Sequence, residues 1–363
     1  MEEEEEELTA ATTQHAWRRF CPANLDVRRD GWGHGAKLLL HLVLCEEKSC
    51  ARKVTLNRPR KLNCLTFEMV SEIHVAMRTY ENDAKVNLVI VKVFLINGIV
   101  MGGGAGLSMN GMFRIVTENT VFAMPEVLIG HIPDVGASYF LSRLPGYYGE
   151  YLGLTGARIN GVEMLACGLA THFVLSKDLQ QLENALCELV SSDALTISKL
   201  IDKFIYSGQT NQDSFHERLE TINKCFYKET VEEILLSLEE MNSGADKWIV
   251  EAISSLKSAS PTSLKIGLRS IREGRKQTLE LCIAREYIVC SHVVRGTVTN
   301  DFFEGARALL FEKDKKPKWE PSQLCQVSEE MLDKFSAEPD DEDFKCLQLP
   351  ARSSPSTEAR AKL

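Results

Sequence analysis

The sequence predicts an α/β fold whose second half is mostly helical. Short β-prone runs at 37–45 and 51–56 are followed by a helical pattern that begins at Thr66, and Leu88–Ile96 has the pattern of a further strand. From about residue 150 to about residue 335 the spacing of apolar residues is largely helical. Strand patterns that alternate with helical patterns are typical of α/β proteins.

The first elements are predicted from short local signals. The two β-prone runs flank Glu46-Glu47-Lys48-Ser49, which indicates a hairpin, and Asn57-Arg58-Pro59 ends its second strand. The helical pattern after Thr66 has one apolar face, made of Phe67, Val70, Ile73, Met77 and Tyr80. The strand pattern of 88–96 stops at Asn97-Gly98, a turn signal.

Composition and charge limit the classes of function. The chain has 363 residues, of which 44% are hydrophobic and 26% charged, enough to bury a sizeable core. Its net charge is −9, and Glu2–Glu7 supply six of the acidic groups. An acidic balance argues against nucleic-acid binding, which needs basic groups to neutralise phosphates. The apolar run Leu38–Cys45 is too short to cross a bilayer, so no membrane partner is predicted.

The cysteines and histidines predict neither disulfides nor a metal site. There are eleven cysteines, an odd number, and no C-x-x-C pair occurs. Without a signal peptide this indicates free thiols in a reducing compartment. The eight histidines are dispersed and no H-E-x-x-H occurs, so we expect no metal.

Changes of composition divide the chain into four predicted parts. Residues 1–35 form a flexible acidic extension, and 36–190 form the core domain. Residues 191–335 form a helical region, and 336–363, rich in acidic residues and then in Ser, Pro and Arg, form a disordered tail.

A glycine-rich segment, Gly102-Gly103-Gly104-Ala105-Gly106, follows the apolar run and is predicted to open a helix. It is no dinucleotide fingerprint, because Met109 stands where the third glycine would be, and it lacks the Gly-Lys-Ser/Thr of a P-loop. Two interpretations stay open. The glycines serve close packing of a helix on a sheet, or their N–H groups hold an anion or oxyanion.

Two acids stand out in the mostly apolar window Val121–Leu144, where the other charged residue is Arg143. A carboxyl group in apolar surroundings has a raised pKa, which suits general acid/base chemistry. For Asp134, the pattern favours the first turn of a helix instead. Glu126 has no such local role, although an exposed edge position would explain it. His131 lies between them and is expected to be solvated.

Together these segments resemble a known family. The motifs are Val54-Thr55-Leu56-Asn57-Arg58-Pro59, Leu62-Asn63-Cys64-Leu65, the triple glycine, Met124-Pro125-Glu126 and Asp301-Phe302-Phe303-Glu304-Gly305. They are similar to the crotonase (enoyl-CoA hydratase/isomerase) superfamily over roughly residues 37–335. The stretch Gly130–Phe140 resembles its 3-hydroxyisobutyryl-CoA hydrolase branch, especially the plant form.

The resemblance implies a crotonase-like spiral of ββα units with a helical C-terminal region. It implies a CoA-thioester substrate and the hydrolysis of 3-hydroxyisobutyryl-CoA in valine degradation, with no cofactor and no metal. Gly103, the middle glycine, would supply one N–H of an oxyanion hole. Glu126 would activate water or attack the thioester carbon, and Asp134 would hold the substrate hydroxyl or serve the leaving thiolate. These three residues are therefore the expected catalytic and substrate-binding residues.

Two departures from the family pattern bear on activity. Hydratases of the superfamily carry a second glutamate two residues past the triple glycine, where this chain has Gly106, which favours the hydrolase over a hydratase or isomerase. Family members also place a glycine-rich segment and several dozen further residues between the strands that match Asn87–Lys92 and Val93–Gly98. Here Lys92 is followed directly by Val93. The missing segment carries the other oxyanion donor, so a catalytically impaired protein that acts by subunit association is the alternative.

The last three residues, Ala361-Lys362-Leu363, differ from the Ser-Lys-Leu peroxisomal address by one residue. Plant members that resemble this chain include peroxisomal ones. We therefore expect a peroxisomal import receptor as a partner and the peroxisome as the location, with the mitochondrion as the alternative. A homo-oligomer is the remaining expected assembly.

Overall fold

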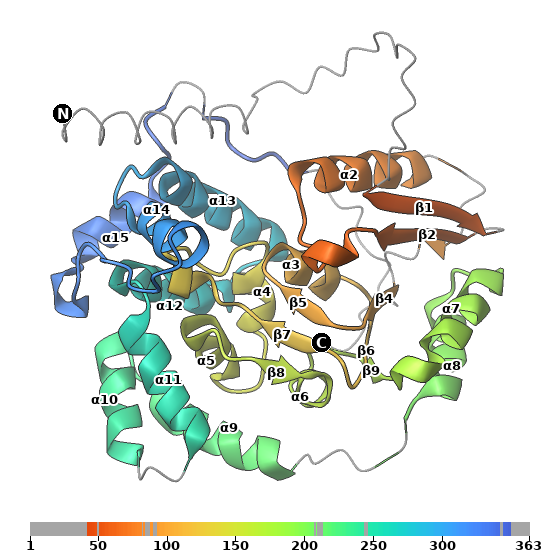
Figure 1. The fold of residues 1–363 in the computed structure, drawn as a ribbon, viewed down its shortest axis with the longest axis horizontal. Coiled ribbons are helices and arrows are strands. Elements are labelled where there is room, and N and C mark those ends of the chain that lie inside the picture. The colour runs from red at the N-terminus through yellow and green to blue at the C-terminus, as the bar shows by residue number, and fades with distance from the viewer. Residues whose placement is uncertain are drawn as a thin grey trace.

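The computed structural model describes most of the chain between residues 42 and 349. The described residues are 42–48, 51–81, 83, 88–89, 93–206, 208, 213–242, 246–341 and 344–349. The predicted extension 1–35 and the end of the tail, with Ala361-Lys362-Leu363, lie outside these residues. Three small sheets lie among the helices, with most helices of the second half on one side (Figure 1).

The first sheet is built by the N-terminal elements. β1 (Val43–Lys48) pairs antiparallel with β2 (Ala51–Leu56), and β2 pairs parallel with β3 (Leu88–Val89). The 3-10 helix η1 (Pro59–Lys61) and helix α2 (Phe67–Glu81) connect β2 to β3. The predicted hairpin and helix are thus confirmed.

The predicted position of the hairpin turn is wrong. Residues Glu46–Lys48, expected in the turn, continue β1 and pair with Lys53–Ala51. Their charges are accommodated because they lie on the exposed part of the sheet, where the Lys53 ammonium contacts Glu46 at 3.0 Å.

The other two sheets carry the site. In one, β4 (Val93–Ile96), β6 (Phe113–Val116) and β9 (His172–Phe173) are parallel. In the other, β5 (Ile99–Met101) pairs parallel with β7 (Val121–Ala123), which pairs antiparallel with β8 (Ile159–Asn160).

The apolar run 88–96, predicted as one strand, is divided between two sheets. Its first part is β3, beside β2, whereas its second part is β4, beside β6. Neighbouring parallel strands of one sheet need a crossover of about a dozen residues. Because β3 and β4 pair in different sheets, they need no such crossover between them.

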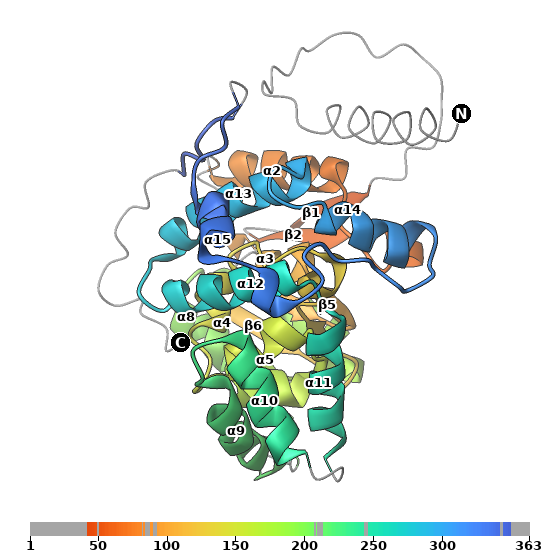
Figure 2. The same cartoon turned by 90° about the vertical axis from the view of Figure 1, so that its left-hand side faces the viewer.

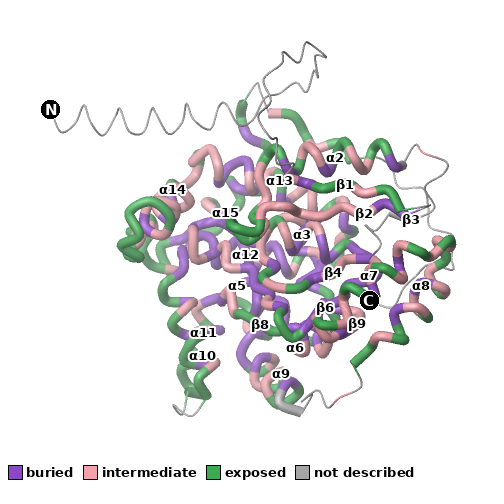
Figure 3. Tube along the Cα trace, turned by 45° about the vertical axis from the view of Figure 1, so that its right-hand side comes forward, coloured by how far each residue is buried: buried purple, intermediate pink, exposed green. Residues whose placement is uncertain are grey.

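Short helices connect these sheets and form the centre of the molecule. They are α3 (Gly103–Met109), η2 (Glu126–Ile129), α4 (Ala137–Leu141), α5 (Tyr148–Thr155) and α6 (Gly161–Ala166). Every residue of α5 is buried. The buried positions gather in the middle of the molecule, and the exposed ones lie on outer helices such as α2 (Figure 3).

The second half is helical, as predicted. Helices α12 (Pro261–Gly274) and α13 (Leu279–Arg295) pack on α4, and α14 (Asp301–Ala306) packs on η2. Figure 2 shows this helical layer from its own side. No described helix is both long and apolar enough to cross a membrane. The remaining elements are η3 (Ser176–Asp178), α7 (Leu179–Glu188), α8 (Ala194–Ile201), η4 (Asp202–Phe204), α9 (Asp213–Phe226), α10 (Val231–Met241), α11 (Lys247–Ser258), the π-helix η5 (Arg307–Phe311), η6 (Leu324–Gln326) and α15 (Glu329–Ser336).

Candidate active site

The glycine-rich segment opens helix α3, as predicted. Gly102 precedes the helix with φ +50° and ψ −127°, a conformation that favours glycine, and Gly103 is the first helical residue. The first helical hydrogen bond runs from the Gly106 N–H to the Gly102 carbonyl at 3.0 Å. The N–H groups of residues 103–105 therefore precede the first bond of the helix and are free of intrahelical partners.

Glu126 lies directly against this glycine turn. A Cβ atom placed on Gly102 would be 3.3 Å from Oε1 of Glu126, a tight contact, so a residue without a side chain best allows this close approach. Glu126 is the first residue of η2, and Pro125 is the N-cap of that helix. Glu126 and Gly102 are 24 positions apart in the sequence, and the fold brings them together.

The Glu126 carboxyl group is buried. Its Oε2 atom is inaccessible and has no hydrogen-bond partner among the described residues. Burial raises the pKa of Glu126 to about 8, and the nearby negative charge of Asp134 contributes to the increase. The exposed edge position considered for Glu126 is therefore wrong. A carboxyl group with a pKa near neutrality is suited to accept and return a proton.

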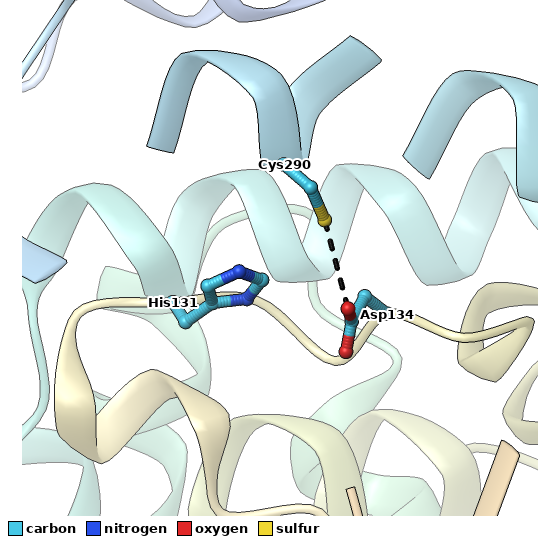
Figure 4. A group of neighbouring side chains, drawn as sticks. All are labelled: His131, Asp134 and Cys290. Atoms are coloured by element: carbon cyan, nitrogen blue, oxygen red, sulfur yellow. Dashed lines mark hydrogen bonds between the residues drawn. The ribbon is translucent and has the colours of Figure 1, made fainter. Parts of the chain in front are cut away.

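Asp134 is not a helix cap, which corrects the interpretation that the pattern favoured. Helix α4 begins three residues later, at Ala137, and its N-cap is Gly136. The Asp134 carboxylate instead accepts a hydrogen bond from the Cys290 thiol on α13, with Sγ and Oδ2 3.8 Å apart (Figure 4). The turn between Asp134 and α4 is unusual, since Val135 has φ +58° and Gly136 has φ +87°.

A buried glutamate on α13 holds this turn. Glu286 accepts hydrogen bonds from the Gly136 N–H at 2.6 Å, the Ser138 N–H at 2.8 Å and the Ser138 hydroxyl at 2.5 Å. Burial raises the pKa of Glu286, against the effect of these hydrogen bonds. The carboxyl group thus fixes the backbone beside Asp134.

Glu286 is not among the site residues predicted from the sequence. One local signal existed: the residue interrupts the stripe of buried side chains Cys282, Val289 and Val293 along α13. A charged residue on a buried helix face needs a polar partner. Its partner is the turn after Asp134, and nothing in the local pattern of α13 points there.

Position 106 has no room for a side chain. A Cβ atom on Gly106 would overlap with the Val135 side chain and would lie 2.8 Å from the Val135 carbonyl oxygen. The structure therefore excludes, at this backbone geometry, the second glutamate that the hydratases carry there.

Helix α14 supports the Glu126 turn through close backbone packing. A Cβ atom on Gly130 would lie 2.8 Å from the Phe302 nitrogen, and one on Gly305 would lie 2.9 Å from the Ile129 Cα atom. Asp301 accepts a hydrogen bond from the Ser260 hydroxyl at 2.5 Å. The late segment 301–305 thus holds η2 in place.

His131 is buried, contrary to the expectation that it is solvated. Its ring packs edge-on against Phe302, with 5.3 Å between ring centres. One ring nitrogen of His131, one Asp134 oxygen and the Cys290 sulfur all lie within 4.8 Å of one another. The nine cysteines in the described part of the chain, Cys290 included, are free thiols.

Comparison with known proteins agrees with this architecture. A sequence model described as enoyl-CoA hydratase/isomerase matches residues 51–93 and 92–336. An Arabidopsis thaliana relative named "Probable 3-hydroxyisobutyryl-CoA hydrolase 2" is 45% identical, over 88% of this chain and 98% of that protein. The human "3-hydroxyisobutyryl-CoA hydrolase, mitochondrial" is 35% identical, over 87% of this chain and 95% of that protein. The Arabidopsis "Small ribosomal subunit protein mS47" is 37% identical, over 85% of this chain and 88% of that protein.

The alignments also support a missing internal segment. The alignment with the first Arabidopsis relative spans 372 positions, whereas 88% of this chain is about 319 residues, so about 53 positions have no residue here. The two parts of the family match meet at residues 92 and 93. This is the point where the resemblance placed the missing segment.

A solved structure shares the fold. A carnitinyl-CoA dehydratase from Mycobacterium thermoresistibile superposes with a TM-score of 0.73 at 28% sequence identity, covering 84% of this chain and 98% of that one. The family match over most of the chain, the relatives at 35–45% identity and this shared fold lead to one conclusion: the chain belongs to the enoyl-CoA hydratase/isomerase (crotonase) family, beside the 3-hydroxyisobutyryl-CoA hydrolases.

Proposed function

We propose that this chain is a thioester hydrolase that converts 3-hydroxyisobutyryl-CoA into 3-hydroxyisobutyrate and CoA, a step of valine degradation. The buried Glu126 carboxyl group, in contact with the glycine turn before α3, carries the proposal. The names of the relatives support this substrate. The lack of space at Gly106 argues against enoyl-CoA hydration, because that reaction uses a second carboxylate there.

The proposed reaction uses three groups of this chain. Ionised Glu126 removes a proton from water, and the oxygen of that water bonds to the thioester carbon. The negative charge that develops on the carbonyl oxygen is stabilised by the Gly103 N–H. The carbon–sulfur bond then breaks, and the CoA thiolate takes the proton from Glu126. Direct attack by Glu126 on the thioester carbon is the alternative first step, and Asp134 either binds the substrate hydroxyl or assists the thiolate.

The missing segment sets the expected rate. With Gly103 as one donor and the second donor absent, turnover should be about a hundred- to a thousand-fold below that of an intact family member. The rival function is a crotonase-fold protein that acts by subunit association alone. The relative named as a ribosomal subunit protein supports that rival, since a protein of this family is there named for an assembly.

Kinetics of two isosteric variants test the proposal. Release of free CoA from 3-hydroxyisobutyryl-CoA is measured for the parent, Glu126→Gln and Asp134→Asn, with thermal denaturation to show that each is folded. We expect both variants to lose at least about tenfold in kcat. Full activity of both folded variants would refute the assignment, and a parent without activity on any acyl-CoA would favour the subunit role.

For the cellular location, we propose the peroxisome. Ala361-Lys362-Leu363 would bind the import receptor that reads C-terminal tripeptides. The mitochondrion is the alternative, supported by relatives whose names place them there. A homo-oligomer is the proposed assembly.

A further inference from the structure

Three side chains at Asp134 could together bind a metal ion. His131, Asp134 and Cys290 offer a nitrogen, an oxygen and a sulfur, and one such atom from each lies within 4.8 Å of the other two. His131 and Asp134 come from the loop after η2, and Cys290 comes from α13 (Figure 4). Nitrogen, oxygen and sulfur ligands in one cluster are those that zinc and cadmium ions bind.

We propose that His131, Asp134 and Cys290 form a binding site for a thiophilic divalent cation, Zn²⁺ or Cd²⁺, and that the bound ion inhibits the enzyme. Hydrolysis itself needs no metal in this proposal. The ion would instead occupy the carboxylate of Asp134 and remove it from catalysis. The inhibition rests on the proposed function, whereas the binding does not.

The distances allow a tetrahedral site after small side-chain movements. Zinc binds sulfur at about 2.3 Å and nitrogen or oxygen at about 2.0–2.2 Å, so two tetrahedral ligands are about 3.3–3.7 Å apart. Sγ of Cys290 and Oδ2 of Asp134 are 3.8 Å apart. The widest separation in the cluster is at most 4.8 Å, which rotation of a side chain can reduce.

The surroundings of His131 also suit a metal ligand. A histidine that binds metal typically donates its other N–H to a carbonyl or carboxylate oxygen, which fixes the ring. Nδ1 of His131 lies 2.8 Å from the Ile132 carbonyl oxygen and also 2.8 Å from the Ile132 backbone nitrogen, and the edge-on contact with Phe302 further restrains the ring. With hydrogen on Nδ1, the carbonyl accepts that hydrogen and Nε2 can bind the ion. With Nδ1 accepting from the Ile132 N–H instead, Nε2 carries the hydrogen, and the ion replaces it on binding.

When the ion binds, the protein loses one proton. The Cys290 thiol, which donates to Asp134, releases its proton to solvent when the metal–sulfur bond forms. Three protein ligands leave a fourth position for water, the arrangement of an open zinc site. The nearby Glu286 carboxyl group adds no ligand in this arrangement, because it is held by Gly136 and Ser138.

Metal titration of the whole chain tests the site. Cd²⁺ is added to the reduced protein, and the ultraviolet absorption of the cadmium–thiolate bond is recorded; Zn²⁺ affinity is measured by competition with a chelating dye. Cys290→Ser and His131→Gln are compared with Cys325→Ser, which removes an exposed thiol elsewhere. Thermal denaturation without metal shows that each variant is folded.

We expect the parent and Cys325→Ser to bind one equivalent with equal affinity, and Cys290→Ser and His131→Gln to bind about 10- to 100-fold more weakly. Loss of the cadmium–thiolate absorption is expected in Cys290→Ser alone among these variants. Unchanged affinity and absorption in the folded Cys290→Ser variant would overturn the site. Inhibition of thioester hydrolysis at the same metal concentrations is measured separately, so an inactive parent would refute the proposed function without affecting the binding result.

Discussion

The backbone N–H of Gly136 donates a hydrogen bond of 2.6 Å to Glu286, a residue 150 positions later in the sequence. Because Gly136 has φ +87° and follows Val135 with φ +58°, the turn adopts a conformation that the chain alone does not favour. The same carboxyl group also accepts from the N–H and hydroxyl of Ser138. Glu286 therefore determines the position of the backbone beside Asp134.

The first prediction is that Glu286→Ala destabilises the protein by about 3 kcal/mol or more. It leaves the N–H groups of Gly136 and Ser138 buried without an acceptor, and each such group costs about 1–3 kcal/mol. Glu286→Gln should have a smaller effect because its amide oxygen still accepts. Urea denaturation measures the change.

The matched control is Glu251→Gln on helix α11, whose exposed carboxylate pairs with Lys247 at 3.4 Å. An exposed ion pair of this kind contributes less than about 1 kcal/mol. Equal stabilities of Glu286→Ala and Glu251→Gln would contradict the role of Glu286. Turnover of 3-hydroxyisobutyryl-CoA by the folded Glu286→Gln variant should fall in kcat, because Asp134 is then less well positioned.

The second prediction compares two glycines of helix α3. Gly106→Ala places a Cβ atom against Val135 and should destabilise the protein by several kcal/mol, whereas a Cβ on Gly104 meets no atom within 4 Å. Gly104→Ala should therefore be neutral or stabilising by up to about 1 kcal/mol, since alanine favours helix. Denaturation midpoints of the two variants give the comparison. A stable, soluble Gly106→Glu variant with hydratase activity would show that the steric argument is wrong.

The third prediction concerns Glu126 and pH. The pKa of this group is raised from 4.5 to about 8 in the folded protein, so the unfolded chain ionises first as the pH rises. Below about pH 4.5 both states are protonated and the group has no effect. Between about pH 4.5 and 8 the folded state progressively loses stability relative to the unfolded state, because ionisation of the buried group is disfavoured.

Glu126→Gln removes this loss. The variant should gain stability over the parent on the order of a few kcal/mol near pH 8, since one pKa unit corresponds to about 1.4 kcal/mol, and little near pH 4.5. Melting temperatures of both proteins across this range test the sign. A difference that is constant with pH would show that Glu126 ionises normally. In the active parent, hydrolysis by ionised Glu126 should rise with pH toward about 8.

The fourth prediction concerns the missing segment. Inserting, after Lys92, the segment that the Arabidopsis relative carries at this point should raise turnover by about a hundred- to a thousand-fold, because it returns the second oxyanion donor. Steady-state kinetics with 3-hydroxyisobutyryl-CoA compare the two chains. A flexible insert of equal length without the motif is the control, and equal turnover of the native-segment chain and the parent would disprove the effect.

The fifth prediction concerns location. A chain with an N-terminal fluorescent tag should enter peroxisomes, and the same chain without Ala361-Lys362-Leu363 should not. Co-localisation with peroxisomal and mitochondrial markers distinguishes the two locations. An identical distribution of both chains would contradict the peroxisomal proposal.

Local patterns predicted the elements formed by residues close together in the chain. The β1–β2 hairpin, helix α2 and the helix start at Gly103 depend on alternation, helical periodicity and glycine conformation over a few residues. The resemblance of short motifs also identified the family and the discontinuity at Lys92–Val93, because those motifs are local stretches of sequence.

The tertiary structure decided which side chains meet. Asp134 had the local pattern of a helix start, yet Glu286 fixes the turn that follows it, and Cys290 on the same helix contacts its carboxylate. The run 88–96 had the pattern of one strand, but its halves pair with different partners. Local patterns arise from contacts within one or two turns, whereas burial and hydrogen bonding across 150 positions depend on how α13 packs over the loop that bears Asp134.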